Sequence, residues 1–212
     1  MADFDFAQLL VTFVVLIASL TFHEAAHAWT ANRLGDPTAR LLGRLSLNPA
    51  VHIDPIGTLL FPLIAMVTGA PLIGWAKPVP VDMRNLRDPK RDFAIVALAG
   101  PVSNLLLAVV GAAVMSAAFG DGALAALRTG DVIATGIFTF ILLNVLLAVF
   151  NMIPIPPLDG GNVLIGILPA PMAAVVERLR TYGFVLLYLL LLSGVLGAIT
   201  RPVQRFILDA LL

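Results

Sequence analysis

Residues 6–29 read FAQLLVTFVVLIASLTFHEAAHAW, a long apolar stretch with His23, Glu24 and His27 near its end. A run of about 20 apolar residues is long enough to cross a membrane as a helix. An ionisable side chain at the centre of a bilayer costs roughly 2.5 to 3.5 kcal/mol, so three of them together need a compensating interaction. The stretch therefore predicts a transmembrane helix that carries a polar functional site.

The spacing of the two histidines is that of a metal site. On a helix, His23 and His27 are one turn apart and project from the same face, so both imidazoles can bind one Zn²⁺ ion. Glu24 is rotated by about 100° around the helix axis and can reach a metal-bound water instead. HExxH also occurs by accident in soluble helices, but burial in a membrane favours the metal site, because bound zinc is worth on the order of 10 kcal/mol.

The composition independently places the chain in a membrane. Hydrophobic residues make up 59% of the sequence and charged residues 12%, and the mean hydropathy is +0.98. The absence of cysteine excludes disulfides and thiolate chemistry, and a net charge of zero argues against a nucleic-acid partner. Asp3 and Asp5 stand where a cleavable signal peptide would carry basic residues, so we expect the first segment to remain in the mature protein. Membrane lipid is the expected surrounding.

Four apolar segments are interpreted as full spans: residues 6–32, 93–119, 132–152 and 183–199. A shorter apolar segment covers residues 162–169. The segment 56–69 has only 14 residues and contains Pro62, so it predicts a re-entrant or interfacial hairpin.

Two further stretches, Thr38–Leu47 and Trp75–Val81, are predicted to form short strands at the membrane surface. The expected fold is therefore an all-α integral membrane protein of about four transmembrane helices, with a hairpin and short surface strands. We expect a single domain over residues 1–212, and the sequence predicts no particular oligomeric state.

Asp159 is the candidate for a third metal ligand, because zinc with two histidines commonly takes a carboxylate and leaves a fourth position to water. It follows a span whose helix must break at Pro154, Pro156 and Pro157, and broken backbone at membrane depth is tolerated where it lines a cavity. The alternative is that Asp159 merely caps the next short helix. Glu177, the other glutamate, lies among arginines and is interpreted as a solvated loop charge.

These motifs resemble those of the site-2 proteases (peptidase M50), which are zinc intramembrane metalloproteases. The resemblance rests on HExxH at residues 23–27, on Gly100-Pro-Val-Ser-Asn104, and on Asn151 with Leu158-Asp159-Gly160. Together they span most of the chain, without the PDZ-like or nucleotide-sensing modules of larger members. The chain thus looks like a short standalone form.

The resemblance implies a function and a set of roles. His23, His27 and Asp159 would bind zinc, Glu24 would be the general base, and Asn151 would steady the oxyanion. The implied reaction is hydrolysis of peptide bonds within or near the transmembrane segment of a membrane protein or peptide substrate. Two other classes remain open: a membrane zinc transporter, which would need a second polar intramembrane cluster, and a catalytically inactive membrane scaffold.

Three features keep two interpretations each. Asn104 is either a helix-packing amide or a residue near the site. His52 is either an interfacial histidine or an auxiliary residue near the zinc. The stretch 75–81 either holds an unwound substrate as a strand edge or, through Pro78 and Pro80, protects an edge from pairing.

Charge distribution predicts the orientation in the membrane. His23 lies 17 residues after Phe6, roughly 25 Å along a helix, so it is near the far end of the first span. With four crossings and a hairpin that does not cross, Asp159 arrives at that same side. Ten of the 13 Lys and Arg residues then share the metal side, leaving Arg128, Arg201 and Arg205 opposite. The positive-inside rule makes the metal side cytoplasmic. We expect the membrane to be the cytoplasmic membrane of a prokaryotic cell.

Overall fold

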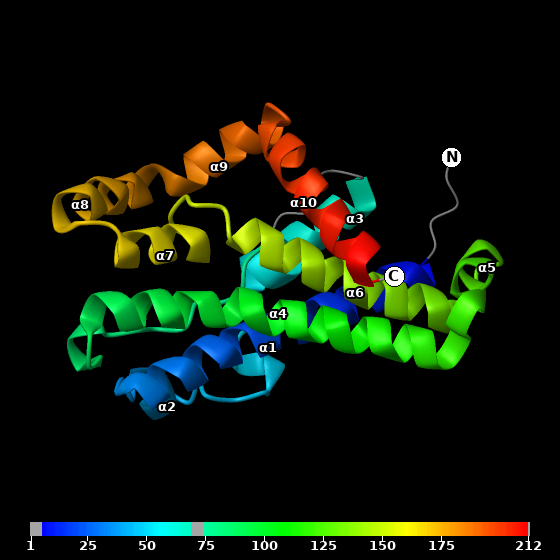
Figure 1. Ribbon diagram of the computed structural model, residues 1–212, viewed down its shortest axis with the longest axis horizontal. Coiled ribbons are helices and arrows are strands. Elements are labelled where there is room, and N and C mark those ends of the chain that lie inside the picture. Colours follow the sequence, from blue (N-terminus) through cyan, green and yellow to red (C-terminus); the bar gives the residue numbers. More distant parts are fainter. Residues whose placement is uncertain (1–5, 69–73, 212) are drawn as a thin grey trace.

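The computed structural model describes residues 6–68 and 74–211, and every regular element in this part of the chain is a helix (Figure 1). Three long helices lie side by side and form the body of the protein: α1 (Phe6–Leu34), α4 (Pro89–Phe119) and α6 (Val132–Asn151). Each is long and apolar enough to cross a membrane. The predicted all-α membrane architecture is therefore confirmed at this level.

Small residues let α4 and α6 approach closely. Ala108 and Ala112 of α4 pack with Met115 against Ile141 and other buried residues of α6. A Cβ added at Gly111 of α4 would lie 2.9 Å from the Ile141 side chain, so the helices meet where a side chain is absent. Such small-residue contacts are typical of helix packing in membranes, where lipid is as apolar as the helix surface.

The predicted hairpin is a short helical excursion. Its outward arm consists of a π-helical turn, η2 (Pro55–Leu60), followed by α3 (Phe61–Thr68). At Trp75 the chain again lies beside the beginning of this arm, because the Trp75 amide donates a 3.1 Å hydrogen bond to the Gly57 carbonyl. The arm is too short to span a bilayer. Residue 69, the last of the predicted segment, lies outside the described residues.

The prediction of short surface strands over Thr38–Leu47 and Trp75–Val81 was wrong. Thr38–Leu41 forms the short helix α2, and the chain then turns through Gly43, whose φ is 71°. Residues 75–81 are extended but pair with no neighbouring strand within the described ranges. The physical reason is that Pro78 and Pro80 lack an N–H and that the amides of Trp75, Lys77 and Val79 already donate to a loop and to Glu24. Few donors are left for a neighbouring strand of the protein.

The fourth predicted span, residues 183–199, is also not one helix. α9 (Gly183–Leu192) ends before Gly194, whose φ is 76°, and α10 (Val195–Leu211) leaves at a bend of 78° from the preceding helical stretch. Within residues 6–68 and 74–211, three helices are thus long and apolar enough to cross a membrane, or four spans if this bent pair counts as one. The remaining elements are α5 (Ala123–Arg128), α7 (Asp159–Ile167), α8 (Ala170–Leu179) and the short turns η1 (Pro49–Val51), η3 (Met83–Asn85), η4 (Gly120–Gly122) and η5 (Arg180–Tyr182).

Candidate metal centre

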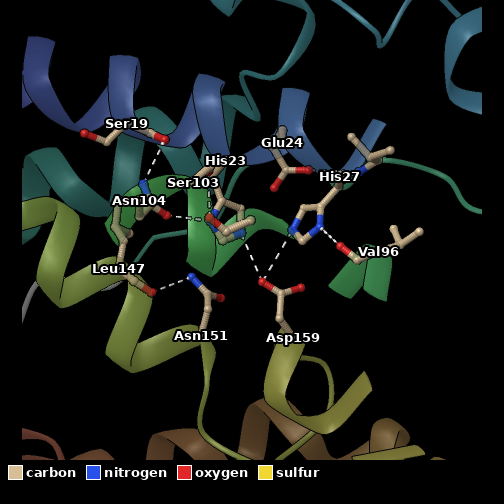
Figure 2. Close-up of polar contacts among 12 residues, drawn as sticks. Ser19, His23, Glu24, His27, Val96, Ser103, Asn104, Leu147, Asn151 and Asp159 are labelled. Atoms are coloured by element: carbon tan, nitrogen blue, oxygen red, sulfur yellow. Dashed lines mark hydrogen bonds and ion pairs between the residues drawn. The ribbon is translucent and has the colours of Figure 1, made fainter. Parts of the chain in front are cut away.

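Three possible ligand atoms converge between α1 and α7. His23 and His27 lie one turn apart on α1, and Asp159 is the first residue of α7. One Asp159 carboxylate oxygen lies 3.0 Å from His23 Nε2 and 3.4 Å from His27 Nε2 (Figure 2). All three ligand atoms fall within 4.8 Å of one another, and both histidines are buried. The structure therefore brings together the three residues that the sequence proposed as a ligand set.

The turn that delivers Asp159 is built from proline and glycine. α6 ends at Asn151, and the Pro-rich segment leads directly into α7. A Cβ at Gly160 would lie 2.3 Å from the Met152 carbonyl oxygen, and one at Gly161 would lie 2.3 Å from the Pro156 nitrogen. Because backbone packs on backbone here, only glycine fits at these two positions. The close packing fixes where α7 begins, and with it the position of the carboxylate.

Gly100 of α4 leaves the space that an ion would need. A Cβ at this position would lie 2.4 Å from His27 Nε2 and 2.5 Å from His23 Nε2. Those are the two atoms that face Asp159. The helix therefore approaches the histidine pair with a hydrogen atom where any other residue would place a methyl group or more.

The other ring nitrogens are held by the protein. His27 Nδ1 lies 2.7 Å from the Val96 carbonyl oxygen, which can only accept, so this nitrogen carries the hydrogen. His23 Nδ1 lies 2.6 Å from Oδ1 of Asn104. Metal-binding histidines usually donate their second N–H to such a partner, which directs the free lone pair at the ion. Two Nε2 atoms and one carboxylate, with room at Gly100, fit a zinc ion that keeps a fourth position open.

Glu24 is buried next to this group. Its Oε2 accepts a 3.0 Å hydrogen bond from the backbone amide of Val79, in the extended segment. Figure 2 shows the Glu24 side chain extending from α1 beside His27. The bond fixes the direction of one carboxylate oxygen, and no donor to the other oxygen is found in the described part of the chain.

The segment that supplies the Val79 amide is anchored at both ends. Trp75 pairs with Gly57 in the hairpin, and the Asp82 amide donates to buried Asp36 at 2.7 Å, just beyond α1. Asp36 also accepts from three further groups: the amide and hydroxyl of Thr38 and the side chain of Asn85. Burial raises the pKa of Asp36, but these hydrogen bonds outweigh it and leave the pKa lowered.

The other proposed site residues lie at different distances from the centre. Asn151, the last residue of α6, donates from Nδ2 to the Leu147 carbonyl oxygen at 3.0 Å, and Figure 2 draws it on the same side of the two histidines as Asp159. Asn104 contacts His23 directly. His52 is 2% exposed and hydrogen-bonds through Nε2 to the Ser46 carbonyl oxygen; no contact with His23, His27 or Asp159 is found for it among the described residues.

Sequence reasoning did not identify two buried polar residues behind His23. Ser19 of α1 and Asn144 of α6 are both fully buried and hydrogen-bond to each other. Their signal was present, because each is a polar side chain within an apolar span. Their partners on other helices could not be identified from spacing along one helix.

Comparison with known proteins gives consistent matches. The model of peptidase family M50 matches residues 11–192. The chain is 38% identical over 201 residues to the Bacillus subtilis protein named "Putative zinc metalloprotease YwhC", covering 94% of this chain and 88% of that protein. It is 34% identical over 189 residues to "Putative zinc metalloprotease Rip2" of Mycolicibacterium smegmatis, covering 87% and 69%. No solved structure matches the chain significantly.

Proposed function

The chain belongs to peptidase family M50, and from this membership we propose that it is a zinc-dependent intramembrane endopeptidase of the HExxH type. Its substrates are peptide bonds within or near the transmembrane segments of other membrane proteins. The observation that carries the proposal is the convergence of His23, His27 and Asp159 within 4.8 Å, with Glu24 buried beside them. We assign the whole chain, residues 1–212, to one catalytic domain.

His23, His27 and Asp159 would hold the ion through the two Nε2 atoms and the carboxylate. When bound, zinc supplies a water of lowered pKa and polarises a carbonyl group. The protein keeps the site buried, and burial strengthens each electrostatic interaction there. The hydrogen bonds at both Nδ1 atoms hold the two rings in the orientation that points Nε2 at Asp159.

Glu24 is the general base in this proposal. Its carboxylate removes a proton from the attacking water and passes it to the amine that leaves when the peptide bond breaks. The Val79 amide holds one carboxylate oxygen at 3.0 Å, so the second oxygen can take the proton without a reorganisation of the side chain. The geometry supports this role because nothing else in the described contacts of Glu24 competes for that oxygen.

Asn151 would stabilise the negative charge that develops on the substrate oxygen. One of its two amide hydrogens is used by the Leu147 carbonyl. No contact among the described residues uses the second hydrogen, which would bind the substrate. A fixed N–H donor that meets charge only in the transition state lowers the barrier to the chemical step. The tether to Leu147 supplies the fixed orientation.

A substrate helix hides its carbonyls in internal hydrogen bonds, so it must unwind before cleavage. The extended segment 75–81 lies beside Glu24, but the amides of Trp75, Lys77 and Val79 already donate within the protein. Because Pro78 and Pro80 carry no N–H, a substrate pairing with this segment would rely mainly on its carbonyl oxygens. With few free N–H donors, the segment could accept hydrogen bonds from an unwound substrate and still resist pairing with other chains.

The positive-inside rule places the metal centre toward the cytoplasm. Ten of the 13 Lys and Arg residues fall on the metal side in the four-crossing topology. A reporter fused after Asp121 is then expected outside the cytoplasm. A cytoplasmic reporter at that position would contradict the orientation.

The first experiment compares wild type with Glu24→Gln in detergent, measuring zinc content and cleavage of a single-span peptide. One zinc per chain in both, with cleavage only by wild type, is the expected result. Zinc in both with transport across vesicles and no cleavage would replace the protease by the zinc transporter. Absence of metal and of cleavage would leave the membrane scaffold.

A further inference from the structure

A chain of buried amides and a hydroxyl connects three helices behind His23. Asn104 of α4 contacts His23, Asn144 of α6 contacts Asn104, and Ser19 of α1 contacts both amides. All three are fully buried. Figure 2 shows the link from Ser19 through Asn104 to the His23 ring. Together with His23 they put four polar side chains into the core between the helices. Burying such a side chain costs free energy unless it is hydrogen-bonded, so their presence there calls for an explanation.

The direction of every hydrogen bond in this series of polar residues can be worked out from the carbonyl group at its far end, that of Phe140. The Phe140 carbonyl oxygen can only accept, and it lies 2.9 Å from the Asn144 amide, so that end of Asn144 is the NH₂. The NH₂ also reaches Ser19 Oγ at 2.9 Å. The Asn144 oxygen must then face Asn104, 2.8 Å away, and it must receive a hydrogen from it.

The same logic continues to the histidine. The Asn104 NH₂ faces the Asn144 oxygen and also the Ser19 carbonyl oxygen at 3.3 Å, and both only accept. Its oxygen is therefore the atom that faces His23 Nδ1 at 2.6 Å. An amide oxygen cannot donate, so Nδ1 carries the hydrogen, and in the neutral ring Nε2 carries the lone pair. The lone pair of His23 is thus directed toward Asp159.

We propose that Ser19 and Asn144 are positioning residues of the metal centre, which act through Asn104 to hold His23 in its Nδ1–H tautomer. This inference deepens the proposed function and rests on it in one respect only, that His23 binds the ion. His27 needs no such relay, because its partner is the Val96 carbonyl, which cannot rotate to present a donor. Asn104 could present either end of its amide, so its orientation has to be set by its neighbours.

The test removes the relay while leaving Asn104 and the histidines in place. Asn144→Leu deletes the amide at similar volume, and Asn144→Ser shortens it without adding bulk. The matched control is Thr139→Val, which removes a 3.1 Å hydrogen bond from Gln8 between the same helices, α1 and α6, outside the relay. Asn104→Leu is the reference for complete loss of the acceptor.

Two readouts are measured on detergent-purified protein. The chain has three histidines, so ¹⁵N-histidine spectra of the zinc-loaded protein, and of the metal-free protein at alkaline pH, report which nitrogen of His23 carries the hydrogen. Zinc affinity is measured by chelator competition. We expect both Asn144 variants to mix the His23 tautomers in the metal-free protein, where no ion fixes the ring. We expect the same variants to lose about 10-fold in zinc affinity, as outer partners of metal ligands do, with Thr139→Val unchanged.

A pure Nδ1–H tautomer of His23 in the metal-free form of a folded Asn144 variant would overturn the inference. If Asn144→Leu does not fold, Asn144→Ser decides. The proposed function fails separately, when wild type binds no zinc or cleaves nothing. The metal-free spectra would still test the relay in that case, since they need neither metal nor substrate.

Discussion

Gly100→Ala is predicted to empty the metal centre while the helices stay folded. The added Cβ would lie 2.4 Å from His27 Nε2 and 2.5 Å from His23 Nε2, and ordinary contact begins at 3.4 Å. Relieving the contact needs a displacement of about 1 Å between α4 and the rings. Ligand distances in metal sites vary by only about 0.2 Å, so a displacement of this size cannot be absorbed. We expect a loss of about 100-fold or more in zinc affinity.

Helix propensity acts in the opposite direction, which makes the prediction specific. Alanine is about 1 kcal/mol better than glycine inside a helix, so the substitution does not weaken α4 itself. Gly136→Ala in α6 is the matched control, because its Cβ would meet only Val11 Cγ1 at 3.9 Å. Chelator competition measures zinc affinity, and circular dichroism verifies the helical content of both variants. Wild-type affinity in Gly100→Ala would refute the steric reasoning.

Three further predictions concern the parts around the metal. Asn151→Ala should lower kcat by about 10²- to 10³-fold with zinc content unchanged, and an unchanged kcat in single-turnover cleavage would contradict its role. Gly57→Ala would place a Cβ 2.4 Å from the Trp75 ring, so tryptophan fluorescence should shift and turnover should fall with zinc retained. The lowered pKa of Asp36 means that its carboxylate contributes stability above the unfolded value of about 3.9, and that this stability is lost as pH falls through the folded pKa. Asp36→Asn should therefore lose about 1 to 3 kcal/mol near neutral pH and show a weaker acid dependence of its thermal unfolding; parallel pH profiles would exclude the assignment.

The helical part of the fold and the proximity of His23, His27 and Asp159 could be predicted from local pattern. HExxH places two histidines on one face of any helix, and the prolines after Asn151 predict a break that leaves Asp159 at the end of a span. The convergence of His23, His27 and Asp159 agrees with that expectation. These features depend on spacing within one segment, which a sequence displays directly.

The predictions were wrong where a tertiary contact or a single glycine determines the local structure. Apolar length alone predicted one span over residues 183–199, whereas Gly194 ends the helix in a positive-φ conformation. The strand expected over 75–81 has no partner strand in the described part of the chain, because its amides bond to a loop and to Glu24. Asn144 was visible as a polar residue in an apolar span, but its partner on α4 depends on how the helices rotate against each other.

In the proposed mechanism, the bond between Val79 and Glu24 makes two loops part of the catalytic apparatus. Neither loop contacts His23, His27 or Asp159 among the described residues. One loop holds the extended segment through Gly57 and Trp75, and the other holds it through Asp36. Sequence changes in these loops can therefore turn the carboxylate away while the ion stays bound. Inactive variants of this kind would pass every screen based on metal content, and a search for the determinants of turnover has to score cleavage itself.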